Sequence, residues 1–129
     1  MSSDRIERGI ELLEQFRKGG SQSVQKNYSE IAPDIAEYIL GFIFGDLYAR
    51  PGLDLKTKQT ITITALAVLG NAKPQLAYHI ENGLNIGLTR EDIINSLIHI
   101  AGYAGFPVAL NGIATAREVF DKLDGKNKN

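Results

Sequence analysis

The segment QLAYHIENGLNIG, residues 75–87, contains His79, one of the two histidines in the chain. An imidazole has a reference pKa of about 6.5, so it can carry or give a proton at neutral pH. His79 lies beside the apolar stripe of a helical pattern, where a buried ring needs a hydrogen-bond partner. Three interpretations are open: a core histidine with such a partner, a metal ligand, or the acid–base group of an active site.

Cysteine is absent from the chain. Its absence removes disulfides, thiolate metal sites, CxxC redox chemistry and cysteine nucleophiles together. The second histidine, His99, follows 20 residues after the first, so a transition-metal site would need carboxylates to complete it. We therefore expect no metal site.

The composition is that of one globular domain. The 129 residues are 43% hydrophobic and 22% charged, which suits a single domain spanning 1–129. A net charge of −1 gives no indication of a surface for nucleic acid or an anionic membrane. The chain has no run of about 18 apolar residues, and its first residues are charged, which argues against a membrane span and a signal peptide. We expect a cytoplasmic protein.

Helical periodicity and turn residues predict an all-α bundle of about six helices. The segment TITIT could also form a strand, but its apolar pattern continues past the usual strand length and no partner strand appears. Residues 21–32 are polar and could form one short turn of helix. The predicted helices cover residues 3–18, 33–50, 55–71, 74–86, 90–101 and 107–123, and a frayed tail covers 124–129.

The segment EYILGFIFG, residues 37–45, is apolar on nearly every side of a helix. The helical period places Ile35, Ile39, Phe42 or Ile43, and Leu47 on one face. A helix that is apolar all round must be buried on several sides, and a chain this small rarely covers one alone. This pattern favours a homo-oligomer with closed symmetry, and the alternative is a central helix in a monomer.

Three separated blocks resemble the carboxymuconolactone decarboxylase family: GDLYARPGLDLKTKQTITITALAVLG, LAYHIENGLNIGLTREDI and YAGFPVALNGIATAREVF. Their order and spacing carry the resemblance, which covers roughly residues 40–120. It implies the all-helical fold of alkyl hydroperoxidase D-like proteins, with a hexamer or trimer as the expected assembly. It also implies cofactor-free decarboxylation of 4-carboxymuconolactone, or a related small carboxylated lactone, in aromatic catabolism.

The thiol branch of the same superfamily carries C-x-x-C-x-x-x-H. When that motif is laid onto this chain, His79 is its histidine, and Ala72 and Gln75 occupy the cysteine positions. Neither side chain can form a thiolate, so thiol peroxidase chemistry is not available.

The resemblance implies a set of site residues. His79 becomes the candidate catalytic group, as a general acid or as a donor to a developing oxyanion. Arg50 and Lys58 could hold substrate carboxylates, and Tyr103 and Asn111 could donate hydrogen bonds. Each also has an ordinary interpretation. Arg50 and Lys58 could be solvated surface charges, Tyr103 could fill space where the helix is interrupted before Gly105, and Asn111 could be a polar residue on a helix surface.

One departure from the family pattern bears on activity. The family commonly has T-R-E where this chain has Thr57, Lys58 and Gln59. Gln59 cannot act as a general acid or base, although it can orient a ligand or a water. The departure favours, as an alternative, an altered substrate or a non-catalytic oligomer that binds small molecules. His99, in the polar stripe Asp92–Asn95–Ser96–His99–Tyr103, is interpreted as an interface or core residue.

Overall fold

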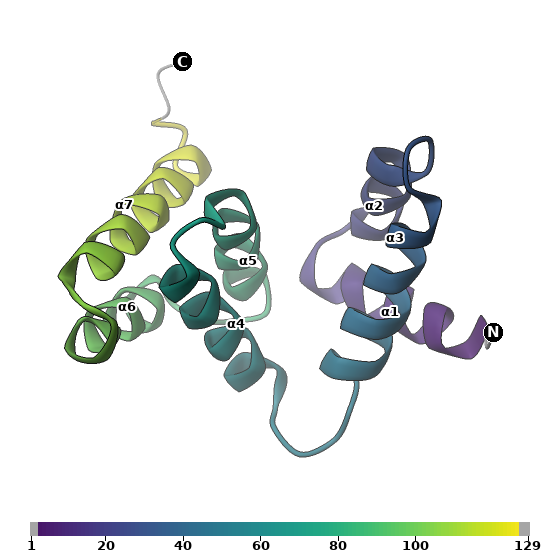
Figure 1. Ribbon diagram of the computed structural model, residues 1–129, viewed down its shortest axis with the longest axis horizontal. Helices are drawn as coiled ribbons and strands as arrows, with labels where there is room; N and C mark the ends of the chain where they lie inside the picture. Colours follow the sequence, from purple (N-terminus) through teal and green to yellow (C-terminus); the bar gives the residue numbers. More distant parts are fainter. Residues whose placement is uncertain (1–2, 127–129) are drawn as a thin grey trace. The chain divides into compact units, whose positions relative to one another are not determined.

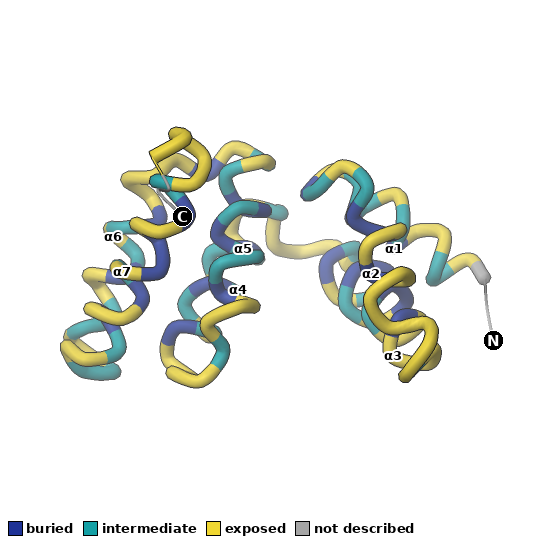
Figure 2. Tube along the Cα trace, turned by 90° about the horizontal axis from the view of Figure 1, so that it is seen from above, coloured by how far each residue is buried: buried dark blue, intermediate teal, exposed yellow. Residues whose placement is uncertain are grey.

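The computed structural model describes residues 3–126, and all of its regular secondary structure in that range is helical, which confirms the all-α prediction (Figure 1). The described residues form seven α-helices and one π-helix, and they contain no strand. The chain divides into two compact units, one ending at Leu55 and the other beginning at Lys56. In both units buried and exposed stretches alternate along each helix, as amphipathic helices require (Figure 2).

The first unit contains α1 (Ser3–Phe16), α2 (Gly20–Tyr28), α3 (Pro33–Tyr38) and the π-helix η1 (Ile39–Tyr48). Helix α2 replaces the short turn expected for this polar stretch. The Glu14 carboxylate accepts from the backbone N–H of Gly19 at 2.8 Å and from that of Ser21 at 3.2 Å. These bonds lower the pKa of Glu14, and they satisfy free N–H groups at the start of α2.

The predicted apolar face of residues 33–50 is wrong. Ile35, Phe42 and Leu47 are each more than 40% exposed, whereas the structure buries a different set: Ala36, Leu40, Phe44 and Tyr48. A π-helix closes i→i+5 hydrogen bonds and so has more residues in each turn than an α-helix. The predicted and the observed faces both have a spacing of about four and differ by a shift of one residue, so the wider turn does not choose between them. The close approach of α1 at Gly45 places the observed face against the core.

Helices α1 and η1 approach each other closely at two glycines. A Cβ on Gly9 would collide with the carbonyl oxygen of Leu40, and one on Gly45 would collide with that of Arg5. Beside this contact the rings of Phe16, Phe44 and Tyr48 pack together, with centroids 5.1–5.8 Å apart. The glycines thus set the helix separation at which these side chains form the core of the first unit.

An ion pair bridges the same two helices. Arg5 donates to the Asp46 carboxylate through Nη2 at 2.7 Å and through Nε at 3.0 Å. Arg8 donates through Nε to the Gly45 carbonyl at 2.8 Å. The Arg5 guanidinium holds the pKa of Asp46 below its usual range.

This depressed pKa predicts an acid-sensitive contribution to stability. The stabilisation is complete above the unfolded-state pKa, about 3.9 for Asp, and is lost as the pH falls through the lower folded-state pKa. Lowering the pH from neutral to about 3 should therefore reduce the free energy of unfolding of the wild type more than that of Asp46→Asn. Urea unfolding at each pH measures both losses. Glu7→Gln, which removes an exposed carboxylate of α1, should keep the wild-type slope. Equal losses in wild type and Asp46→Asn would contradict this contribution.

The second unit contains α4 (Leu55–Leu69), α5 (Lys73–Asn85), α6 (Arg90–Ala104) and α7 (Phe106–Leu123). The segment TITIT lies within α4, so the helical interpretation is confirmed. Helix α7 packs against both α5 and α6. The core of this unit is made of apolar side chains from all four helices and from the loop before α6: Ile63, Ala67, Leu76, Ile80, Leu88, Ile93, Leu97, Ala116 and Val119.

The predicted starts of α5 and α7 and the predicted end of α5 are confirmed, whereas α6 continues to Ala104, past the end predicted at residue 101. Pro74 and Pro107 lie in the first turns of α5 and α7. After α5, Gly87 has φ 107° and its N–H donates to the Leu84 carbonyl at 3.1 Å, while Leu88 N–H donates to the Gly83 carbonyl at 2.9 Å. This is a Schellman end, which needs a residue with positive φ.

Helix α6 begins with the predicted capping box. The Thr89 hydroxyl accepts from Asp92 N–H, and the Asp92 carboxylate accepts from Thr89 N–H, both at 2.9 Å. Beyond α7, Asp124 accepts two hydrogen bonds from Arg90, at 2.7 and 2.9 Å. The first residue of the expected tail is therefore tied to α6, and residues 127–129 lie outside the described range. None of the helices within residues 3–126 is both long and apolar enough to cross a membrane.

Candidate functional site

The candidate site centres on His79 in the middle of α5. Its neighbours Leu76 and Ile80 face the core, with exposed fractions of 4% and 0%. His79 itself is half-buried at the edge of that apolar face, and the Tyr78 ring lies edge-on to it at a centroid distance of 5.2 Å. The helix therefore holds the imidazole at the boundary between core and surface, as the sequence pattern predicts.

Gln59 is the partner of His79. It lies in α4 and is 0% exposed. Its Nε2 lies 3.0 Å from His79 Nδ1 and donates to the His79 carbonyl oxygen at 2.9 Å. A single amide group from α4 thus contacts both the ring and the backbone of the same residue in α5.

Gly83 leaves space for Gln59 against α5. A Cβ at Gly83 would lie 3.3 Å from Gln59 Cγ and 2.9 Å from Leu88 Cδ1, both closer than ordinary packing permits. The Gln59 Oε1 atom is buried and has no hydrogen-bond partner among the described residues. An unsatisfied buried acceptor is costly, so this atom marks a position where a water or a ligand atom would be stabilised.

The remaining predicted residues lie on other surfaces. Lys58 precedes Gln59 in α4 and is half-buried. Tyr103, at the end of α6, is 85% exposed, and its ring lies 5.5 Å from that of His99. Asn111 is an exposed residue of α7 that lines a cavity of about 230 Å³ together with Ala72. Arg50 belongs to the first unit, where it is exposed and lines a separate hollow of about 480 Å³.

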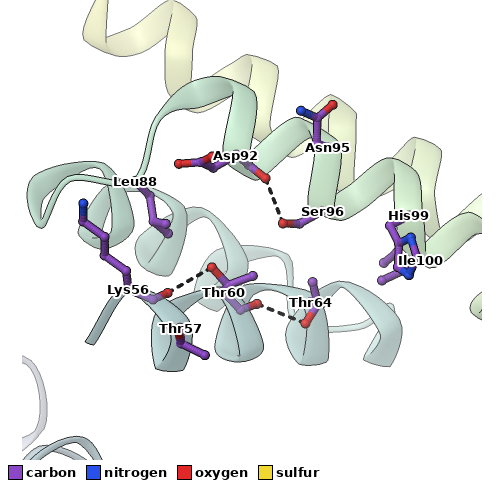
Figure 3. A pocket seen from close by; sticks show the side chains of 10 residues that line it. All are labelled: Lys56, Thr57, Thr60, Thr64, Leu88, Asp92, Asn95, Ser96, His99 and Ile100. Carbon is purple, nitrogen blue, oxygen red and sulfur yellow. Dashed lines mark hydrogen bonds between the residues drawn. The ribbon is translucent and has the colours of Figure 1, made fainter. Parts of the chain in front are cut away.

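The polar stripe noted on α6 lines a cleft. A hollow of about 650 Å³ lies between α4 and α6, with Leu88 at one end, and its other lining residues are Lys56, Thr57, Thr60, Thr64, Asp92, Asn95, Ser96, His99 and Ile100 (Figure 3). His99 is exposed here, so its interpretation as a core residue is wrong. The α4 side of the cleft was not predicted, although threonines at positions 57, 60 and 64 have the spacing of one helix face.

Three hydroxyl groups in this cleft are already committed as donors. Thr60 donates to the Lys56 carbonyl at 2.9 Å, Thr64 to the Thr60 carbonyl at 3.0 Å, and Ser96 to the Asp92 carbonyl at 2.8 Å. The Thr89 backbone N–H lowers the pKa of Asp92 most, and the Lys56 charge lowers it further. These three hydroxyl groups therefore offer acceptor oxygens to the cleft, while Lys56, Asn95 and His99 supply its donors.

No group of three or more histidines and carboxylates that could hold a metal occurs among residues 3–126. Ala72 and Gln75, at the cysteine positions of the thiol branch, lie at the start of α5. Their side chains carry no thiol, so the second unit has no redox pair beside His79.

Comparisons with known proteins extend these observations. A sequence profile of the carboxymuconolactone decarboxylase family matches residues 33–118. The chain is 29% identical over 121 residues to a 4-carboxymuconolactone decarboxylase of Acinetobacter baylyi, covering 92% of this chain and 89% of that protein. It is 27% identical over 120 residues to a 15.0 kDa protein of Paracoccus denitrificans, covering 92% and 90%. It is also 30% identical over 89 residues to a nitrosuccinic acid decarboxylase of Metarhizium robertsii, covering 68% and 62%.

Proposed function

Because the chain belongs to the carboxymuconolactone decarboxylase family, we propose that it removes CO2 from a small carboxylated lactone such as 4-carboxymuconolactone, without a cofactor. The observation that carries this proposal is the half-buried His79 ring held by the buried Gln59 amide. A relative named 4-carboxymuconolactone decarboxylase, similar over most of the chain, supports the substrate class. The reaction would belong to aromatic catabolism, and the expected location is the cytoplasm.

The reaction sets clear demands on the site. The bond between the ring carbon and its carboxylate breaks, and the electron pair moves through the adjacent double bond onto the lactone carbonyl oxygen. CO2 leaves, and a proton from water then adds to the carbon next to that carbonyl. A donor directed at the developing oxyanion lowers the barrier by about 3–4 kcal/mol. His79 is the residue that would meet this oxygen.

The carboxylates of the substrate need cations or donors. Lys58 directly precedes Gln59 in α4 and carries a positive charge, and Arg50 has the planar fork that suits a carboxylate. Tyr103 and Asn111 add donors on α6 and α7. We assign all four, together with Gln59, to substrate binding or positioning as part of the same proposal.

The test is an assay of CO2 release from 4-carboxymuconolactone by the purified wild-type protein. Turnover that saturates with substrate is expected. Nitrosuccinate is a useful second substrate, because one relative is named as its decarboxylase. Turnover of nitrosuccinate alone would change the substrate class, and turnover of neither compound would contradict the proposed activity.

A second candidate function is an oligomeric protein that binds small carboxylated molecules without converting them. Lys58 and Gln59, which depart from the family's R-E pair, favour this candidate. A thermal-shift titration with lactones and dicarboxylates separates the two. Saturable stabilisation without CO2 release supports binding alone, since a ligand that prefers the native state raises the unfolding temperature.

The proposed assembly is a homo-oligomer, either a hexamer or a trimer. Large apolar side chains are exposed in each unit: Ile31 84%, Tyr38 64%, Leu69 65%, Phe106 69% and Leu110 60%. Apolar groups of this size gain free energy when a partner covers them. Light scattering should therefore give a mass three or six times the 14.1 kDa of one chain. A monomer at micromolar concentration would contradict this assembly.

A further inference from the structure

One amide group of Gln59 approaches two acceptor positions on the same histidine. Nε2 lies 2.9 Å from the His79 carbonyl oxygen and 3.0 Å from the ring nitrogen Nδ1. A primary amide nitrogen carries two hydrogens, so it can serve both atoms at once. Gln59 is 0% exposed, which keeps water from competing for either position.

The backbone carbonyl decides which way the amide points. A carbonyl oxygen only accepts hydrogen bonds, so the Gln59 atom beside it must be the nitrogen. If the amide were turned over, Oε1 would lie about as close to the His79 carbonyl oxygen, and two acceptors would face each other. The orientation with Nε2 toward His79 is therefore favoured, and Nδ1 receives a hydrogen.

We propose that Gln59 is a positioning residue that fixes His79 as the neutral tautomer with its proton on Nε2. The Nδ1 lone pair accepts from Gln59, so the single ring proton of a neutral imidazole must be on the other nitrogen. Protonation of Nδ1 would place a ring N–H opposite the amide hydrogens, and two donors facing each other form no hydrogen bond. His79 is thereby held as a hydrogen-bond donor through Nε2.

This assignment has a consequence for the reaction, and that part rests on the proposed decarboxylase function. A neutral ring with Nε2–H donates to the lactone carbonyl oxygen as negative charge develops there, and it keeps its proton through the step. The proton that reaches carbon comes from water. A glutamate at position 59 would do the opposite, because a carboxylate accepts from Nδ1–H and stabilises the doubly protonated ring.

The tautomer can be read directly by 15N NMR of the histidine rings in the full-length protein. Only two histidines are present, so His99→Asn leaves one ring signal and assigns it to His79. At neutral pH we expect Nδ1 at the shift of an unprotonated, hydrogen-bonded nitrogen and Nε2 at the shift of an N–H nitrogen. A protonated Nδ1 in the wild type would overturn the assignment.

Two variants of Gln59 sharpen the measurement. Gln59→Glu should convert Nδ1 from an acceptor to an N–H donor. Gln59→Met, which keeps a similar volume without the amide, should give a mixture of tautomers and a weaker hydrogen-bond signature at Nδ1. Unchanged Nδ1 and Nε2 shifts in folded Gln59→Met would show that the amide does not hold the ring.

Kinetics separate this role from the proposed activity. If the wild type decarboxylates a lactone, Gln59→Met should lower kcat about 10–100-fold, the usual effect of losing a partner that orients a reacting group, with a KM within about threefold. An unchanged kcat would refute the positioning role. If the wild type shows no turnover, the proposed function fails, and the NMR spectra still decide the tautomer.

Discussion

Replacement of His79 by alanine is expected to lower kcat for CO2 release about 10²–10³-fold, the usual effect of removing one donor to an oxyanion. The imidazole would act on charge that develops in the transition state, so the KM should change much less than kcat. The measurement is CO2 release over a range of lactone concentrations for the wild type and the variant.

The second histidine provides the matched control. His99 is exposed in the cleft between α4 and α6, and His99→Ala should keep the wild-type kcat. Thermal unfolding of His79→Ala is needed in parallel, because Gln59 Nε2 loses a ring acceptor in that variant. Undiminished turnover by a folded His79→Ala protein would remove His79 from the reaction.

Gly9→Ala should destabilise the first unit by roughly 3 kcal/mol, the upper end of the range for an overpacked contact. The new Cβ would meet the carbonyl group of Leu40, whose carbon lies 2.7 Å from the added atom. A backbone atom cannot move aside as the end of a flexible side chain can, so α1 would have to separate from η1. Urea unfolding measures the loss.

Gly102 offers a control for Gly9→Ala. It lies in α6, and a Cβ there would meet no atom within 4 Å. Gly102→Ala should stabilise the protein by about 0.5–1 kcal/mol, because alanine loses less backbone entropy than glycine in a helix. A Gly9→Ala protein as stable as the wild type would mean that α1 and η1 pack less closely than the structure describes.

Much of the fold was predictable because its signals are local. The proline starts of α5 and α7, the glycine after α5 and the capping box before α6 depend on a few neighbouring residues, and all are confirmed. The family membership inferred from three motif blocks is also confirmed. Helix α2 was missed because its start depends on the Glu14 carboxylate, which reaches forward from the preceding helix.

The π-helix shows what periodicity cannot supply. The segment EYILGFIFG is apolar in almost any register, so its composition does not select between turns of different width. The closest contacts of η1 are with α1, at Gly9 and Gly45, about 36 residues apart in sequence. The buried face of η1 therefore depends on long-range packing, which a period of 3.6 does not describe.

The two residues at the centre of the candidate site could be singled out from the sequence, and the contact between them could not. His79 stood out by its chemical type, and Gln59 by its departure from a family motif. Their hydrogen bonds depend on how α4 and α5 rotate against each other, which Gly83 makes possible by leaving space for Gln59. The residues next to His79 and Gln59 in the sequence do not determine how these two helices are rotated.

The most direct test of the account is the 15N–1H ring spectrum of His79 with and without a bound lactone. The probe is the saturated analogue of 4-carboxymuconolactone. It cannot decarboxylate, because it lacks the double bond through which the electron pair would be delocalised onto the carbonyl oxygen. We predict that saturating analogue shifts the His79 Nε2–H resonance, leaves Nδ1 as an acceptor and does not alter the His99 signals. Saturable binding that leaves the His79 Nε2–H resonance unchanged would contradict the claim that this ring meets the substrate.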